Sequence, residues 1–120
     1  MTEKPATYNA GNAMPLNLEA FKNRPCSLLY DARYQPPTPE EVAQLINLAG
    51  WSQNDAAKLV GVSWDTKRGS STIRKWKSAK GQKEHREIPF SAWCLFLICA
   101  GVVSPDDALK AIGKPPLNLK

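Results

Sequence analysis

The 120-residue sequence contains a single histidine, His85, and only three cysteines, Cys26, Cys94 and Cys99. One histidine in a charged stretch cannot form a Ser/His/Asp or Cys/His arrangement, and the thiols lack the partners needed for a four-ligand zinc site. An odd number of cysteines at this spacing does not indicate a disulfide framework. We therefore expect no catalytic residue, no metal ligand and no cofactor. Cys94 and Cys99 are expected to be reduced core thiols of a cytoplasmic protein.

Long apolar runs and glycine-rich phosphate loops are also missing. The longest apolar stretch, 90–103, is interrupted by Ser91 and Gly101, and it is shorter than the roughly 20 residues that span a bilayer. Residues 1–10 are polar and lack the apolar segment of a signal peptide. Gly61 and Gly69 fit neither the P-loop nor the dinucleotide fingerprint. We expect no membrane association, and the sequence shows no small-molecule effector site.

What the sequence does contain is a local excess of positive charge. Residues 64–88 carry eight Lys or Arg and three Asp or Glu, a net charge of +5 that equals the net charge of the whole chain. Duplex DNA carries a phosphate charge about every 1.7 Å of its axis, so a local basic patch favours association with it. From charge alone, a solvated basic surface is an equally good interpretation.

The chain divides into three parts by its pattern. Residues 1–37 hold five prolines and no sustained helical period, which predicts an extended, partly ordered arm with one short helix near 18–22. Within the arm, residues 27–34 could be a strand or an extended segment on the core. Residues 38–113 predict an all-α domain, a compact bundle of about five helices, and residues 114–120 form a C-terminal tail.

The five expected helices have start and stop signals of their own. The first, 38–50, opens with a TPEE capping box, carries apolar residues with helical spacing and ends in glycine. The second, 52–61, opens with a serine cap and also ends in glycine. The third starts near the serines at 70–71, the fourth covers about 90–100, and the fifth starts at SPDD, 104–107, and runs to 112.

The segment 50–62, GWSQNDAAKLVGV, followed by STIRKW at 71–76, resembles the phage repressor and Cro-like helix-turn-helix family, often called XRE-like. The resemblance covers about residues 38–101. It implies a lambda-repressor-like fold and a sequence-specific, duplex DNA-binding transcriptional regulator, a repressor of phage or mobile-element type, rather than an enzyme. Such regulators usually bind paired half-sites as symmetric dimers. A homodimer is therefore expected, built through the fourth and fifth helices or the N-terminal arm.

The chain departs from the family by six extra residues, WDTKRG at 64–69, before the third helix. Either the recognition helix begins at Ser63 and breaks at Gly69, or a basic loop precedes a helix that starts at Ser70. The loop is favoured because glycine followed by two serines is the better helix start. Trp64, inside the insertion, has no evident core role.

The resemblance also assigns roles by position. Four residues of the third helix are expected to face base edges in the major groove: Ser70, Ser71, Arg74 and Lys75. Gln53 matches a family position that holds a backbone phosphate. Further phosphate contacts are expected from Lys67, Arg68, Thr72 and Lys77.

Several alternatives stay open at this level. The fourth helix is apolar on nearly every side, so it is either central and wrapped by residues 1–37 or covered by another chain. The helix-turn-helix could instead serve as a protein-interaction module whose basic patch binds an acidic protein or a nucleoprotein complex. RNA binding is less favoured, because the chain has no aromatic stacking platform. The arm could reach a minor groove through Lys22, Arg24 or Arg33.

Overall fold

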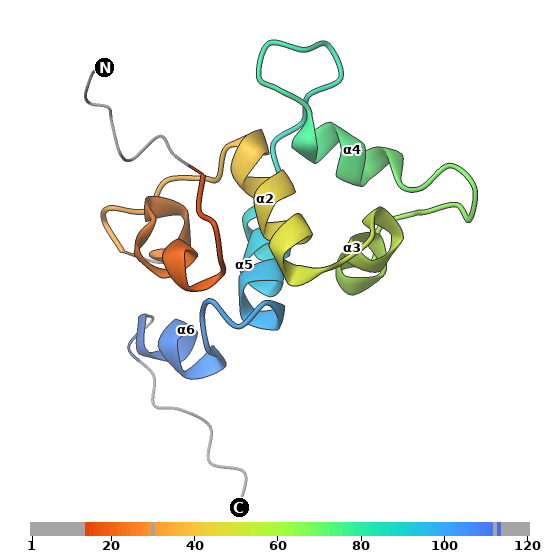
Figure 1. Ribbon diagram of the computed structural model, residues 1–120. Coiled ribbons are helices and arrows are strands. Elements are labelled where there is room, and N and C mark those ends of the chain that lie inside the picture. The colour runs from red at the N-terminus through yellow and green to blue at the C-terminus, as the bar shows by residue number, and fades with distance from the viewer. Residues whose placement is uncertain (1–13, 30, 112, 114–120) are drawn as a thin grey trace, which may run out of the picture.

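The computed structural model describes residues 14–29, 31–111 and 113 (Figure 1). Within them the chain forms five α-helices and two 3-10 helices, and the only extended pairing is one antiparallel bridge between Asp65 and Gly69. The all-α class predicted from the sequence is confirmed. In chain order the elements are η2 (Glu19–Asn23), η3 (Pro25–Ser27), α2 (Pro39–Ala49), α3 (Gln53–Val60), α4 (Ser71–Lys77), α5 (Phe90–Cys99) and α6 (Pro105–Ala111). In this part of the chain, no helix has both the length and the apolar character that crossing a membrane requires.

The predicted capping signals set the helix boundaries. At the start of α2 the backbone N–H of Glu41 donates to Thr38 Oγ1 at 3.1 Å, and the N–H of Thr38 donates to Glu41 Oε1 at 2.8 Å. The helix ends at Gly50, whose φ of 78° lies in the left-handed region that favours glycine. Ser52 and Asp55 form the same reciprocal pair at the start of α3. Both predicted caps are therefore confirmed in position, and the predicted partner Glu41 is confirmed for Thr38.

The fifth expected helix also begins as the sequence indicates. At its start the N–H of Asp107 donates to Ser104 Oγ at 3.0 Å, and the N–H of Ser104 donates back to Asp107 Oδ2 at 3.2 Å. The helix, α6, ends at Ala111. Residue 112, where the sequence placed its end, lies outside the described residues.

Helix α5 lies at the centre of the fold, behind α2 in Figure 1 and in contact with α3. One face of α5 is buried and includes Trp93 and Phe96, both fully inaccessible. Another side of α5 is more open: Leu95 is 37% exposed there, whereas Phe90 at the start of the helix packs edge-on against Tyr34, with ring centroids 5.3 Å apart. The helix is therefore a core helix on one side, and Leu95 and Cys99 are exposed on the other.

The described part of the N-terminal segment covers another side of the core. Phe21, Cys26 and Leu29 are buried there, and the short helix expected near residues 18–22 is η2. Neither the strand nor the extended segment considered for 27–34 is found, because Ser27 ends η3 and turns or bends follow at residues 29 and 31–33. Pro25 fixes φ at the start of η3, and backbone bonds three residues apart then bend the chain onto the core.

The cysteines are distributed differently from the prediction. All three are free thiols: Cys26 is buried, Cys94 is half-buried and Cys99 is exposed. The expectation of a core thiol at position 99 is wrong, because Cys99 lies one helical turn after Leu95, on the open face of α5.

Candidate nucleic-acid interface

Helix α4 is held on the core by its apolar side and shows a polar side to solvent. Ile73 is fully buried and Trp76 is 6% exposed, three residues apart on the face that packs against α2 and α3. Helical spacing then places Ser71, Arg74 and Lys75 on the opposite face. Together with Gln53 of α3 and three residues near the C-terminal end of α4, they line a surface hollow of about 390 Å³.

Ser70 is placed differently from the other expected base-reading residues. Its side chain is 1% exposed, and its hydroxyl accepts a hydrogen bond of 3.3 Å from the backbone N–H of Ile73. This is the N-cap of α4, so the helix starts where the sequence indicated. A base contact by Ser70 would require this cap to open.

The inserted residues 64–69 form a closed turn, which confirms the loop interpretation over an early helix. Asp65 and Gly69 exchange two backbone hydrogen bonds, of 2.7 and 2.9 Å. Within the turn, Asp65 Oδ1 accepts from the backbone N–H groups of Arg68 at 3.0 Å and Lys67 at 2.8 Å. These two bonds hold the pKa of Asp65 below its usual value. We call residues Asp65–Gly69 the basic turn.

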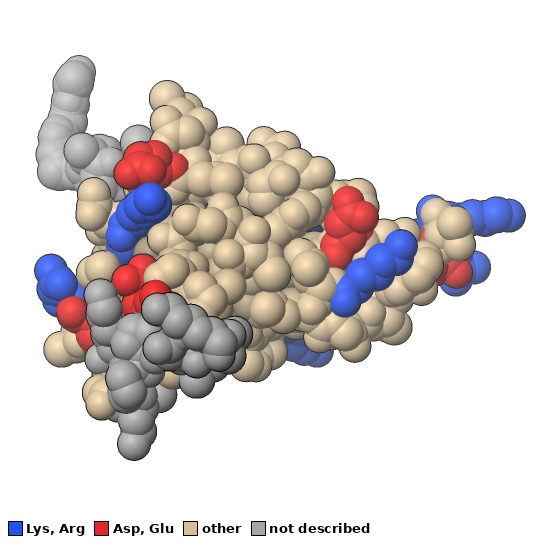
Figure 2. Space-filling model, turned by 90° about the horizontal axis from the view of Figure 1, so that it is seen from below, with Lys and Arg blue, Asp and Glu red and all other residues tan. Residues whose placement is uncertain are grey.

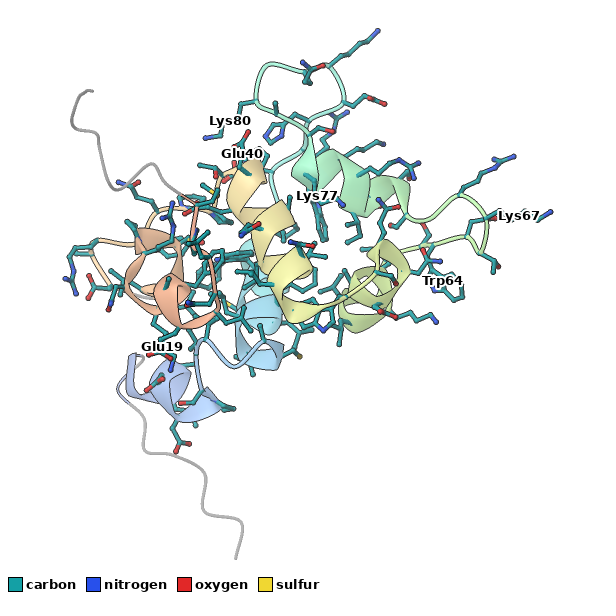
Figure 3. All side chains as sticks on the ribbon, in the orientation of Figure 1. Glu19, Glu40, Trp64, Lys67, Lys77 and Lys80 are labelled. Atoms are coloured by element: carbon teal, nitrogen blue, oxygen red, sulfur yellow. The ribbon has the colours of Figure 1, made fainter. Side chains whose placement is uncertain are left out.

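The basic turn presents its cations outward. Lys67 and Arg68 are both exposed, and Figure 3 shows Lys67 at the far end of the turn, pointing away from the helices. Trp64, at the base of the turn, is 44% exposed, and Lys58 Nζ lies 4.4 Å from the centre of its ring. Trp64 therefore covers the side of the turn that faces α3.

Gln53 joins α3, the basic turn and α4. Its Oε1 accepts from the backbone N–H of Ser70 at 2.7 Å and from Arg74 Nη1 at 3.3 Å. The same Nη1 donates to the carbonyl oxygen of Arg68 at 2.6 Å. Gly69 allows this approach, because a Cβ at that position would lie 2.1 Å from Gln53 Oε1. We call this set of contacts the Gln53–Arg74 bracket.

The bracket leaves part of Gln53 for a ligand. Its Nε2 has no partner among the described residues, so its two N–H donors remain for an acceptor such as a phosphate. The N-terminus of α3 itself is occupied, because Ser52 and Asp55 cap it reciprocally. Hydrogen bonds from Ser52 lower the pKa of Asp55.

The remaining phosphate candidates, Thr72 and Lys77, are half-buried on α4. Lys77 lies near the C-terminal end of α4, in the hollow described above. Glu84 also borders this hollow, so the surface is not uniformly positive.

Residues 78–87 form a loop that closes back onto α4. His85 Nδ1 lies 2.7 Å from the carbonyl oxygen of Ser78 and carries the proton in this contact, since a carbonyl only accepts. The backbone N–H of Arg86 donates to the carbonyl oxygen of Lys75 at 3.1 Å. His85 therefore holds the loop closed. The sequence gives no local signal for this role, because Ser78 is seven residues away. The loop residue Lys80 borders the same surface hollow as Thr38 and Pro39 at the start of α2, and Figure 3 shows it far from Lys67.

The cations of the N-terminal segment have intramolecular partners. Arg24 Nε lies 2.6 Å from Glu41 Oε2, with only 17% of the Arg24 side chain exposed. Lys22 pairs with Glu19 at 3.1 Å, and Arg33 pairs with Asp31 at 3.0 Å. The structure does not bring these residues to the surface formed by α4 and the basic turn.

The face of the molecule seen from below in Figure 2 is largely uncharged. Lys and Arg are few there and lie mostly near Asp or Glu, toward its two ends. In the part of the chain that the structure describes, no three His, Cys, Asp or Glu side chains gather as a possible metal site.

No family model matches the chain. Two curated proteins, both named transcriptional repressor protein KorC and both from Escherichia coli, are similar to it. One is 36% identical and the other 30% identical over 70 residues, which cover 58% of this chain and 73% of each relative. Both relatives carry the name of a regulator and not of an enzyme. The chain belongs to the KorC family of transcriptional repressor proteins.

Proposed function

We propose that the protein is a transcriptional repressor that binds specific duplex DNA sites in the cytoplasm. In this proposal α3, the connection 61–70 and α4 act as a helix-turn-helix of the XRE-like, lambda-repressor-like type, and α4 enters the major groove. The observation that carries the proposal is the polar outer face of α4, held by the buried Ile73 and Trp76 and flanked by the basic turn. The names of the two relatives support the same function.

The contacts divide into base-reading and backbone-positioning groups. Arg74 and Lys75 lie on the outer face of α4 and are suited to guanine O6 and N7, with Ser71 beside them. The phosphate backbone is contacted by side chains around this face: Gln53, Lys67, Arg68, Thr72 and Lys77. Ser70 stays in its cap and supports the start of α4.

We also propose that the repressor acts as a homodimer, because a two-fold symmetric protein matches paired half-sites. The exposed side of α5 that carries Leu95 and Cys99 supports an interface there. This arrangement would cover the Leu95 side chain, which the single chain leaves 37% exposed.

The test is a selection of binding sites from a random duplex library, followed by titration of the selected duplex and a scrambled duplex at two salt concentrations. Wild type is compared with Arg74→Ala/Lys75→Ala. Lys22→Ala/Arg33→Ala, which removes the same charge from the N-terminal segment, is the control. We expect an inverted-repeat site that only the α4 variant fails to select.

Equal, salt-sensitive binding to both duplexes by the wild type would contradict sequence-specific repression. The scaffold would then be assigned to binding an acidic protein partner.

A further inference from the structure

We propose that Gln53 is a positioning residue that determines base specificity by fixing the guanidinium of Arg74. This inference rests on the proposed function, in which Arg74 reads a base. It assigns Gln53 a role that differs from a phosphate contact. The carboxamide oxygen would orient the reading side chain, while the carboxamide nitrogen remains available to the DNA backbone.

The geometry shows which part of Arg74 is fixed. Its Nη1 donates to two oxygens, Arg68 O at 2.6 Å and Gln53 Oε1 at 3.3 Å. Guanidinium has five N–H donors in one plane, and two of them belong to Nη1. No described residue accepts from Nε or Nη2 of Arg74. The edge formed by Nε and Nη2 is therefore left for a bidentate contact with a guanine.

Because Nη1 of Arg74 is held by two oxygens, the orientation of the opposite edge, formed by Nε and Nη2, is restricted as well. An exposed arginine normally samples many rotamers, and this freedom is lost when it binds a base. Two acceptors from different segments, the basic turn and α3, restrict the orientation of the Arg74 guanidinium plane in the free protein. The same Gln53 oxygen also accepts from the N–H of Ser70. One atom therefore holds both the start of α4 and the Arg74 side chain.

Gly69 provides an independent way to disturb the bracket. A methyl group at Gly69 would lie 2.1 Å from Gln53 Oε1 and 3.6 Å from Arg74 Nη1, so Gln53 would have to swing away. Gly61 has the same φ of 78°, but a Cβ there would meet nothing within 4 Å. Gly61→Ala is therefore a matched control for the backbone strain that any side chain causes at positive φ.

The experiment compares base preference at each position of the selected site for five variants. Arg74→Ala identifies the base pair that Arg74 reads. We expect Gln53→Ala and Gly69→Ala to lose about tenfold in preference at that same base pair, as expected when a bidentate contact is weakened. Gln53→Glu keeps the accepting oxygen and loses the Nε2 donors, so it should bind DNA more weakly but retain the preference. Gly61→Ala should also retain it.

Two results would overturn the inference. One is an unchanged preference in Gln53→Ala at the base pair that Arg74→Ala affects. The other is an equal loss of preference in Gln53→Ala and Gln53→Glu, which would show that the accepting oxygen does not set the preference. Failure of the wild type to select any site would instead contradict the proposed function.

A measurement without DNA tests the positioning directly. In the free protein, nitrogen NMR of Arg74 should show slow rotation of its guanidinium in wild type and Gln53→Glu. Rotation should be faster in Gln53→Ala and Gly69→Ala. Fast, averaged signals from the Nη atoms of Arg74 in the wild type would contradict the Gln53–Arg74 bracket, whatever the DNA-binding experiments show. Thermal unfolding of each variant ensures that folded protein is compared.

Discussion

The indole Nε1 of Trp93, in the middle of α5, donates a hydrogen bond of 2.8 Å to the carbonyl oxygen of Cys26. The two residues are 67 positions apart, and both are buried. The bond therefore joins the N-terminal segment to the central helix. It also gives a hydrogen-bond donor to the Cys26 carbonyl, which is buried away from water.

Replacing Trp93 by Phe should lower the free energy of unfolding by about 1–3 kcal/mol, because the Cys26 carbonyl loses its donor and the smaller ring leaves a void. Urea unfolding at 25 °C measures the change. Trp64→Phe is the control, since Trp64 is 44% exposed and its replacement should change the free energy by less than about 0.5 kcal/mol. Equal effects at both positions would contradict the stabilising role of the Trp93 bond.

The ion pair between Arg24 and Glu41 fixes the same N-terminal segment to α2. Only 17% of the Arg24 side chain and 8% of the Glu41 side chain are exposed, so solvent screens the pair weakly. Glu41→Gln retains an oxygen for the Thr38 cap but removes the charge. We expect a loss of about 2–3 kcal/mol in unfolding free energy, because the largely buried pair loses its carboxylate charge.

The control for that variant is Asp31→Asn, which removes a carboxylate from the exposed pair with Arg33. We expect little change there, since exposed ion pairs contribute little to stability. A Glu41→Gln protein as stable as wild type would show that the cap, and not the charge, is what Glu41 provides.

The three thiols should react in the order of their exposure. Burial, and next the nearby Glu41 carboxylate, raise the pKa of Cys26 to about 12, so its thiol stays protonated at neutral pH. Cys99 is exposed on α5 and Cys94 is half-buried. Alkylation at pH 7.5, followed by mass mapping of the peptides, should modify Cys99 first, Cys94 more slowly and Cys26 only on unfolding. Modification of Cys26 as fast as Cys99 would contradict its buried position.

The same Cys26 thiol makes the stability depend on alkaline pH. Its pKa rises from an ordinary value of 9.0 to about 12 on folding, so above pH 9 the unfolded chain holds fewer protons than the folded one. The contribution is complete below pH 9 and is lost as the pH rises toward 12. Urea unfolding between pH 8 and 10.5 should show a falling free energy. Cys26→Ala should fall less steeply, with Tyr34, whose pKa burial also raises, accounting for part of the remaining slope.

Local signals allowed most of the fold to be predicted. The caps at Thr38 and Ser52 involve side chains three residues apart, so the sequence contains both partners next to each other. The start of α4 at Ser71 followed from a glycine and two serines in the same way. Ile73 and Trp76 are three residues apart on α4, a spacing that places them on one helix face, and both are buried.

Contacts between distant residues could not be predicted in this way. The bond from Ser70 to Gln53 spans 17 positions, and no pattern in either segment indicates that a glutamine oxygen will meet that N–H. The prediction that Cys99 is a core thiol was wrong for a related reason. On a helix that is apolar on nearly every side, the sequence does not indicate which face the other helices will cover.

The basic turn should contribute phosphate contacts that are independent of DNA sequence. Lys67→Ala/Arg68→Ala removes two exposed cations without touching the hydrogen bonds that close the turn, since those use only backbone atoms of these two residues. We expect weaker binding to the selected and scrambled duplexes alike. The slope of log affinity against log salt should become shallower by about 2, since two fewer phosphates release their counterions. A variant that keeps the wild-type salt slope but changes its base preference would show that the turn reads bases and not the backbone.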